Sequence, residues 1–152
     1  MRKQIIGGYG YYYDDEKNII YPFENIDSYG FFSTFTLMLT SLMGVYFEHG
    51  KTPDVIGGNI LNNLKSVEER NNGYDMYHHF FHIDKDYEIE IEDLPPMYNA
   101  NDHHKIYTEE ELKYYYPFFR KYFNLNDNVQ KKVDFLMKKY NIDLENTVAI
   151  VY

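Results

Sequence analysis

The chain has 152 residues, with 24 acidic and 15 basic side chains and a formal net charge of −9. This charge argues against non-specific binding to nucleic acids or anionic membranes, because both need excess positive charge. The chain contains no cysteine, which excludes a disulfide scaffold and any cysteine-based zinc or redox site.

Aromatic residues make up 19% of the chain, with 18 Tyr, 11 Phe and no Trp. This composition is typical of an A/T-rich coding sequence, such as a viral one, so runs of tyrosine are not evidence of function. The apolar segment 31–47 is interrupted by small polar residues and falls short of the roughly 20 residues that span a bilayer. No signal peptide is visible. We expect a cytoplasmic or otherwise intracellular protein without a membrane span.

The first third of the chain predicts a βαβ unit. Residues 18–23 are a β-rich apolar run, and turn-forming residues follow it. Apolar residues of the segment 31–47 then recur at spacings of three and four with almost no charge between them, which predicts a helix buried on most sides. Gly50 stands where a C-cap glycine belongs, and 52–56 resembles a short second strand. Two strands joined through a helix run parallel.

The middle of the chain is less regular. Asn59 can cap a helix that ends near Asn71. Tyr87, Ile89 and Ile91 alternate with glutamates, and this period of two predicts a half-exposed strand.

The last third predicts two helices. Thr108 and Glu111 have the spacing of a capping box, and Pro117 is expected to kink the helix that follows. Four apolar residues of this helix follow at helical intervals: Leu112, Tyr116, Phe119 and Phe123. Asn126 or Asp127 can open a second helix, with an apolar side expected to face inward and a lysine side facing solvent. The apolar side comprises Val129, Val133, Leu136, Met137 and Tyr140, and the lysines are Lys131, Lys132, Lys138 and Lys139.

The turn 27–33 is the best candidate site. Gly30 stands where the strand passes into the helix, so backbone N–H groups can approach a ligand, and a helix N-terminus favours anions such as a diphosphate. Ser28 or Ser33 could donate a hydroxyl, and Asp27 could accept a proton from a sugar hydroxyl. The alternative is structural: Asp27 or Ser28 caps the helix and Gly30 only allows the turn, because one glycine is far weaker than the motif GxGxxG.

Two groups of histidines invite a metal interpretation, but neither has a recognised ligand spacing, so ordinary surface or half-buried histidines are the favoured interpretation. They are His78, His79 and His82 near Asp75 or Asp84, and His103 and His104 beside Asp102. We expect no metal and no cofactor.

The order of elements resembles the opening of the fucosyltransferase-like glycosyltransferases, the O-fucosyltransferase and α-1,6-fucosyltransferase group with a GT-B-type fold. Residues 27–35 match the family's glycine turn, and the step from Gly50 to Pro53 matches its G-x-x-P step into the second strand. Residues 74–81 stand where relatives carry an aromatic W-x-Y-Y-F segment. The segments 108–133 and 148–152 resemble the connection into the second domain.

The resemblance implies an α/β fold, in which 1–146 form a Rossmann-like three-layer domain with a mostly parallel sheet. The run 147–152 would be the first strand of a second domain, because a buried strand needs neighbours, so we expect the chain to be the front half of a longer GT-B protein. The arginine that clamps the leaving diphosphate would lie beyond Tyr152, so the chain alone would be inactive.

The activity that the resemblance implies is inverting, metal-independent transfer of a sugar, such as fucose, from a nucleotide diphosphate sugar to a glycan or protein acceptor. Asp27 would be the base, and the substrate-binding residues would be Ser28, Gly30, Phe31, Phe32 and Ser33. The alternative is a non-enzymatic α/β binding or assembly module whose aromatic-rich surface packs on a partner. A nucleotide-binding hydrolase is a weaker third choice, because no P-loop or nucleophile motif is present.

Overall fold

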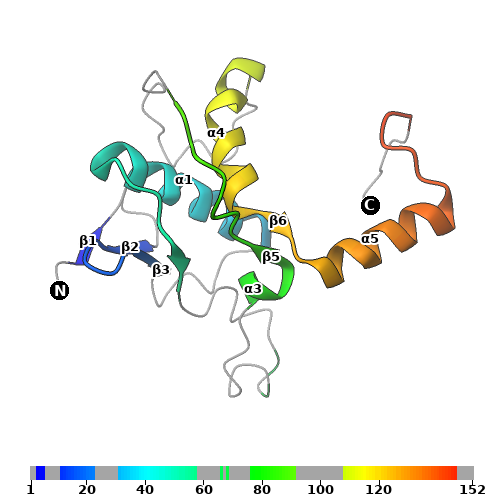
Figure 1. The fold of residues 1–152 in the computed structure, drawn as a ribbon, viewed down its shortest axis with the longest axis horizontal. Coiled ribbons are helices and arrows are strands. Elements are labelled where there is room, and N and C mark those ends of the chain that lie inside the picture. Colours follow the sequence, from blue (N-terminus) through cyan, green and yellow to red (C-terminus); the bar gives the residue numbers. More distant parts are fainter. Residues whose placement is uncertain are drawn as a thin grey trace.

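The computed structural model describes residues 3–5, 11–22, 31–57, 66, 68, 76–91 and 108–146. They form a mixed α/β structure, as the sequence predicts (Figure 1). Its strands are β1 (Lys3–Ile5), β2 (Tyr11–Asp14), β3 (Ile19–Pro22), β4 (Val55–Ile56), β5 (Phe81–His82) and β6 (Asn124–Leu125). Its helices are α1 (Phe31–His49), α3 (Met76–Phe80), α4 (Glu109–Tyr122) and α5 (Asp127–Tyr140). Of the helix predicted at 59–71, only residues 66 and 68 are among the residues described, and the strand predicted at 147–152 lies outside them.

The larger sheet has the order β1-β2-β3-β4. β3 and β4 are parallel, with Ile19 opposite Val55 and Ile20 opposite Ile56, so the predicted βαβ unit of β3, α1 and β4 is confirmed. β1 and β2 pair antiparallel, as do β2 and β3. The sheet is thus mixed in the described part of the chain, not mostly parallel as expected. The reason is the four-residue turn between β2 and β3, which is too short for a parallel crossover and can only reverse the chain.

A polar network joins this turn to the loop before β4. Asn18 adopts the left-handed conformation with φ 53°, which asparagine tolerates better than most residues. Its side chain accepts a hydrogen bond from the Tyr13 hydroxyl at 2.6 Å and donates to the Thr52 carbonyl at 2.9 Å. The Asp54 N–H donates to the Asn18 carbonyl at 3.0 Å, so the network fixes the edge where β4 begins.

Helix α1 is buried from two sides, as its near lack of charge predicts. On the sheet side, the Tyr11 hydroxyl donates to the Thr34 carbonyl at 3.3 Å. On the other side, the Tyr46 ring meets the Phe118 ring of α4 edge to face, with centroids 5.5 Å apart. Met38 and Leu42 between these contacts are fully buried, and burial of such side chains contributes about 1.5–3 kcal/mol each. The helix is therefore the centre of the core.

The segment 87–91 is not a strand of either described sheet, so this prediction is wrong. The alternation behind it is real, since Ile89 is buried and Glu88 and Glu90 are exposed. Side chains, not a neighbouring strand, bind its carbonyl groups. The Tyr46 hydroxyl donates to the Ile89 carbonyl at 3.2 Å, and the Lys121 ammonium donates to the Tyr87 carbonyl at 2.7 Å.

Helix α4 begins with the predicted capping box. The Thr108 hydroxyl accepts from the Glu111 N–H at 3.2 Å, and the Glu111 carboxylate accepts from the Thr108 N–H at 2.9 Å. Pro117 lies inside the helix. No helix in the described part of the chain is long and apolar enough to cross a bilayer.

Candidate functional site

The loop singled out by the sequence falls mostly outside the described residues. Asp27, Ser28 and Gly30 are not among them, and Phe31, Phe32 and Ser33 enter only as the backbone of the first turn of α1. The described part fixes what flanks the loop: it follows the carboxyl end of β3 and precedes α1. Its role in binding or catalysis stays a prediction.

The histidines offer no metal centre in the part of the chain that the structure describes. His78, His79 and His82 are exposed, and the described residues hold no group of three or more potential metal ligands. His103 and His104 lie outside them. A polar hollow of about 470 Å³ lies at His82, Asn126, Asp127 and Asn128, beside the start of α5.

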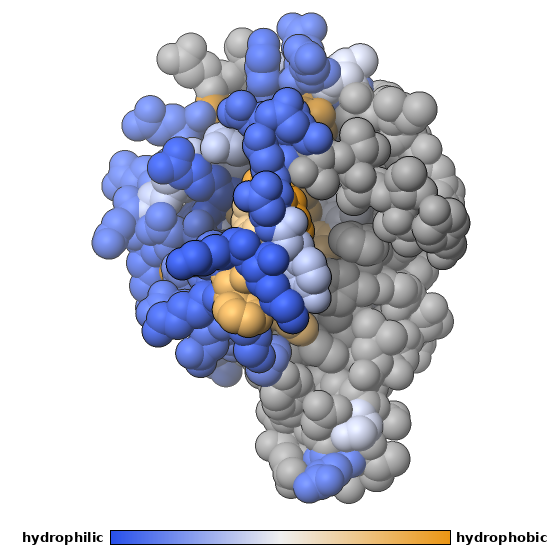
Figure 2. All heavy atoms as spheres, turned by 90° about the vertical axis from the view of Figure 1, so that its right-hand side faces the viewer, coloured by the Kyte–Doolittle hydropathy of each residue, from blue (hydrophilic) through white to orange (hydrophobic). Residues whose placement is uncertain are grey.

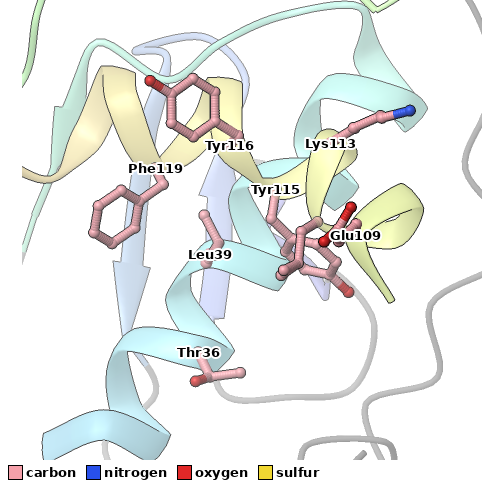
Figure 3. A pocket seen from close by; sticks show the side chains of 8 residues that line it. Thr36, Leu39, Glu109, Lys113, Tyr115, Tyr116 and Phe119 are labelled. Carbon is pink, nitrogen blue, oxygen red and sulfur yellow. The ribbon is translucent and has the colours of Figure 1, made fainter. Parts of the chain in front are cut away.

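An apolar groove lies between α1 and α4, with a volume of about 710 Å³. Figure 3 shows Thr36 and Leu39 on α1, with the remaining labelled residues on α4. Phe119 lies at one end of the view and Glu109 at the other. The full lining is Thr36, Leu39, Glu109, Leu112, Lys113, Tyr115, Tyr116 and Phe119.

The α4 side of this groove is formed by apolar residues that recur at helical intervals in the sequence. Leu112, Tyr116 and Phe119 are 48%, 61% and 53% exposed. Of the four residues in this pattern, only Phe123 is buried, at 7% exposure. The reason is that α4 carries a second apolar stripe, Phe118 and Tyr122, which is the one that faces the core. Leu112 and Tyr116 have the same spacing of four, so the local sequence does not distinguish the buried stripe from the exposed one.

Buried polar contacts fix the rotation of α4 and so expose the groove. The Tyr122 hydroxyl donates to the Pro53 carbonyl at 2.8 Å, and the Tyr77 hydroxyl donates to the Tyr122 carbonyl. Burial raises the pKa of the Tyr122 hydroxyl well above its ordinary value, so it remains a neutral donor. Lys121, only 7% exposed, donates to the Asp84 carbonyl at 3.1 Å as well as to the Tyr87 carbonyl. None of these long-range contacts has a signal in the local sequence.

The charged end of the groove lies at the first turn of α4, where its lining holds one acidic and one basic side chain, Glu109 and Lys113. Glu109, Glu110 and Glu111 form the first turn of α4, and Glu109 itself lines the groove. Lys113 is the basic residue among the lining side chains. An apolar surface with carboxylates at one end favours a ligand that is itself apolar along one face and cationic at its edge.

Helix α5 is the second unusual surface. It has the predicted caps: Asn126 accepts from the Val129 N–H at 3.0 Å, and Asn141 ends the helix in the left-handed conformation. It buries no residue, however, so the expectation that its apolar side faces inward is wrong. Leu136 and Tyr140 are 46% and 61% exposed. In Figure 1 the helix projects away from the sheet, α1 and α4. Figure 2 views the molecule from this side and shows hydrophobic atoms next to strongly hydrophilic ones.

The direction of α5 is set where it begins. β6, immediately before it, pairs with β5, with Leu125 opposite Phe81. The Asn126 N–H then donates to the Phe80 carbonyl at 2.9 Å, and its side-chain amide donates to the His79 carbonyl. These contacts hold the helix start against α3, so the rest of α5 extends outward.

Comparison with known proteins adds no relative. No protein-family model, curated protein or solved structure matches the chain. The groove between α1 and α4 and the apolar side of α5 are therefore interpreted from their own geometry.

Proposed function

We propose that the chain is a protein-binding or assembly module whose α1–α4 groove holds an amphipathic helix bearing cationic side chains. The observation that carries this proposal is the exposure of Leu112, Tyr116 and Phe119 along one side of α4. Contiguous exposed apolar side chains that line a hollow are typical of interaction sites. Aromatic side chains in particular dominate the binding energy of such sites.

The spacing of these residues favours a helix as the ligand. Leu112, Tyr116 and Phe119 stand at intervals of four and three, so they form one stripe along α4, which is ~21 Å long. A second helix matches such a stripe with its own residues at i, i+3, i+4 and i+7. The carboxylates at the first turn of α4 would attract lysine or arginine beside that stripe.

The test is a titration of the whole chain with a synthetic helical peptide that has leucines along one face and lysines along the other. We expect saturable binding, measured by fluorescence anisotropy. A peptide of the same composition, with the leucines distributed around the helix, should bind weakly. Leu112→Lys should weaken binding of the amphipathic peptide by about tenfold or more, because it places a charge inside the groove.

Leu144→Lys is the matched control, because Leu144 is an exposed leucine (76%) outside both the groove and α5. It should bind the peptide as the unmodified chain does. Equal binding of both peptides, or equal loss in both variants, would overturn the proposal.

The second candidate function is that of the family that the sequence resembles. We propose it on the β3–α1–β4 unit, because in open α/β sheets ligands bind beyond the carboxyl ends of parallel strands, and the segment 23–30 follows that end of β3. In this proposal the chain is the Rossmann-like first half of a GT-B glycosyltransferase. Asp27 would be the base, and Ser28, Gly30, Phe31, Phe32 and Ser33 would bind the nucleotide diphosphate sugar.

Titration of the full-length protein with GDP, UDP and dTDP sugars tests this candidate. Saturable binding of one of them, lost in Gly30→Val while the circular dichroism is unchanged, is the expected result. Binding of none, or binding that Gly30→Val leaves unchanged, would remove the loop from consideration.

A further inference from the structure

We infer that the helix that fills the groove is α5 of a second copy of this chain, so that two copies exchange their α5 helices. This inference rests on the proposed function of the α1–α4 groove and names its partner. It joins two observations that are otherwise separate: a groove with exposed apolar residues, and a capped helix that projects from the same chain and buries none of its apolar residues.

Helix α5 is amphipathic and basic, which is the kind of helix proposed as the ligand of the groove. Its apolar residues fall on one side of the helix at intervals of three and four: Val129, Val133, Leu136, Met137 and Tyr140. The opposite side carries four lysines, against two aspartates in the whole helix. This helix is thus basic, although the chain as a whole has a net charge of −9.

The two helices fit each other best when antiparallel. Both have 14 residues, so their apolar stripes have the same length. Lys139, in the last turn of α5 and on the flank of its apolar stripe, would then lie near Glu109, which lines the groove in the first turn of α4. The opposed helix dipoles and these opposite charges both favour this direction. It places Tyr140 of one copy near Leu112 of the other.

The groove of the same chain is a poor match for α5, because the chain would have to reverse direction immediately after α4. At that point Leu125 pairs with Phe81, and the Asn126 N–H donates to the Phe80 carbonyl. These contacts start α5 in a direction that leads away from its own α4 (Figure 1). A second copy can accept α5 without disturbing either.

Exchange also divides the interface that a dimer needs between two identical contacts. A two-fold pair makes the same contact twice, once for each helix and groove. Specific dimers bury about 1,200–2,000 Å² in total, so each helix–groove contact needs to provide only about half of that area.

The first test is the oligomeric state, measured by sedimentation velocity over a dilution series. We expect the unmodified chain to form a dimer. Tyr140→Ser should weaken the dimer by about 30-fold for each of the two contacts, or about a thousandfold in all. Phe135→Ser is the matched control, because Phe135 is equally exposed (63% against 61% for Tyr140) but lies on the lysine side of α5. It should leave the dimer unchanged.

A mixing experiment tests the exchange itself. Leu112→Lys blocks the groove, and Leu136→Asp disables the apolar side of the helix, so each variant alone should be monomeric. An equal mixture restores one intact contact, between the helix of the first variant and the groove of the second, and should form a heterodimer. A dimer that survives Leu112→Lys would overturn the inference, because the groove would then not be part of the dimer interface.

The inference and the proposed function can fail separately. A monomeric wild-type chain, or a mixture that forms no heterodimer, overturns the exchange of α5. The peptide titration then decides the function: saturable binding of the leucine–lysine peptide keeps the groove as a binding site, and no binding removes it. If both hold, Leu136→Asp should bind this peptide more tightly than the wild-type chain, because its groove is not already filled.

Discussion

Helices α4 and α5 have the same length and similar local signals, yet only one is part of the core. Each has 14 residues and an N-cap side chain, from Thr108 in α4 and Asn126 in α5. α4 buries Phe118, Lys121 and Tyr122, whereas α5 buries nothing. Caps and periodicity therefore establish that a helix forms, and contacts far away in the sequence decide which side of it is covered.

The largest difference between the two helices is expected from truncating a phenylalanine in each. Phe118 is fully buried against Tyr46 and Phe47, so Phe118→Ala should lower the free energy of unfolding by about 3–5 kcal/mol. Phe135→Ala on α5 should change it by only about 0.5 kcal/mol or less, because Phe135 is 63% exposed. Urea unfolding followed by circular dichroism measures both. Similar losses in the two variants would contradict the burial described for these helices.

The second expected effect concerns lysine. Lys121 donates to the Asp84 and Tyr87 carbonyls, so Lys121→Met would leave these acceptors without their buried donor and should lower the free energy of unfolding by about 1–3 kcal/mol. Lys132→Met on the exposed side of α5 is the control and should have almost no effect. Hydrogen exchange should increase at 84–91 in the first variant alone. Unchanged protection there would mean that Lys121 does not hold this segment.

The third effect compares the two N-caps. Thr108→Ala removes the acceptor for the Glu111 N–H and should lower the free energy of unfolding by about 1 kcal/mol. Asn126→Ala removes the acceptor for the Val129 N–H and the contact with the His79 carbonyl, so its main result should be local fraying of α5. Amide exchange of α5 measured by NMR distinguishes local from global loss. Global destabilisation by Asn126→Ala that exceeds that of Thr108→Ala, measured at a concentration where the chain is monomeric, would show that α5 packs against the core of its own chain.

The smallest effect is the pH dependence of the surface pair Asp15–Lys51. A hydrogen bond of 2.7 Å from Lys51 holds the pKa of the Asp15 carboxyl below its usual value of 3.8. Because the pKa of this carboxyl is lower in the folded chain than in the unfolded chain, its ionisation stabilises the fold. This stabilisation is fully present at a pH above the unfolded-state pKa. It is lost as the pH falls through the folded-state pKa. The free energy of unfolding of Asp15→Asn should therefore be lower than that of the wild-type chain at neutral pH and equal to it in strong acid. Lys51→Gln should show the same dependence of the free energy of unfolding on pH. A difference in this free energy between variant and wild type that persists in strong acid would contradict the pairing of Asp15 with Lys51.

The sequence predicted the parts of the fold that depend on local chemistry. The cap at Thr108, the start of α5 at Asn126 and the unit β3–α1–β4 all follow from residues close together in the chain. The orientation of α4 did not, because aromatic residues lie on several of its sides and only long-range contacts choose among them. Lys121 is the clearest case, since its two carbonyl partners are 34 and 37 residues away.

The two candidate sites differ in the same way: local sequence indicates one of them, and long-range contacts create the other. The glycine loop at 27–33 is a local motif and remains a sequence prediction, because its side chains lie outside the described residues. The α1–α4 groove was not predicted, because Leu112 and Tyr116 have the spacing of core residues and only the position of Phe118 and Tyr122 turns them outward. An aromatic-rich binding surface was expected in general terms, without its location.

The most direct test of the account uses the absence of cysteine from the natural chain. Chains with Leu112→Cys and chains with Tyr140→Cys are mixed under oxidising conditions, and disulfide-linked pairs are measured on a non-reducing gel. The account predicts rapid formation of the mixed pair, because α5 of one copy brings residue 140 beside residue 112 of the other. Phe135→Cys in place of Tyr140→Cys provides the background rate, and mixed pairs that form no faster than this background would contradict the account.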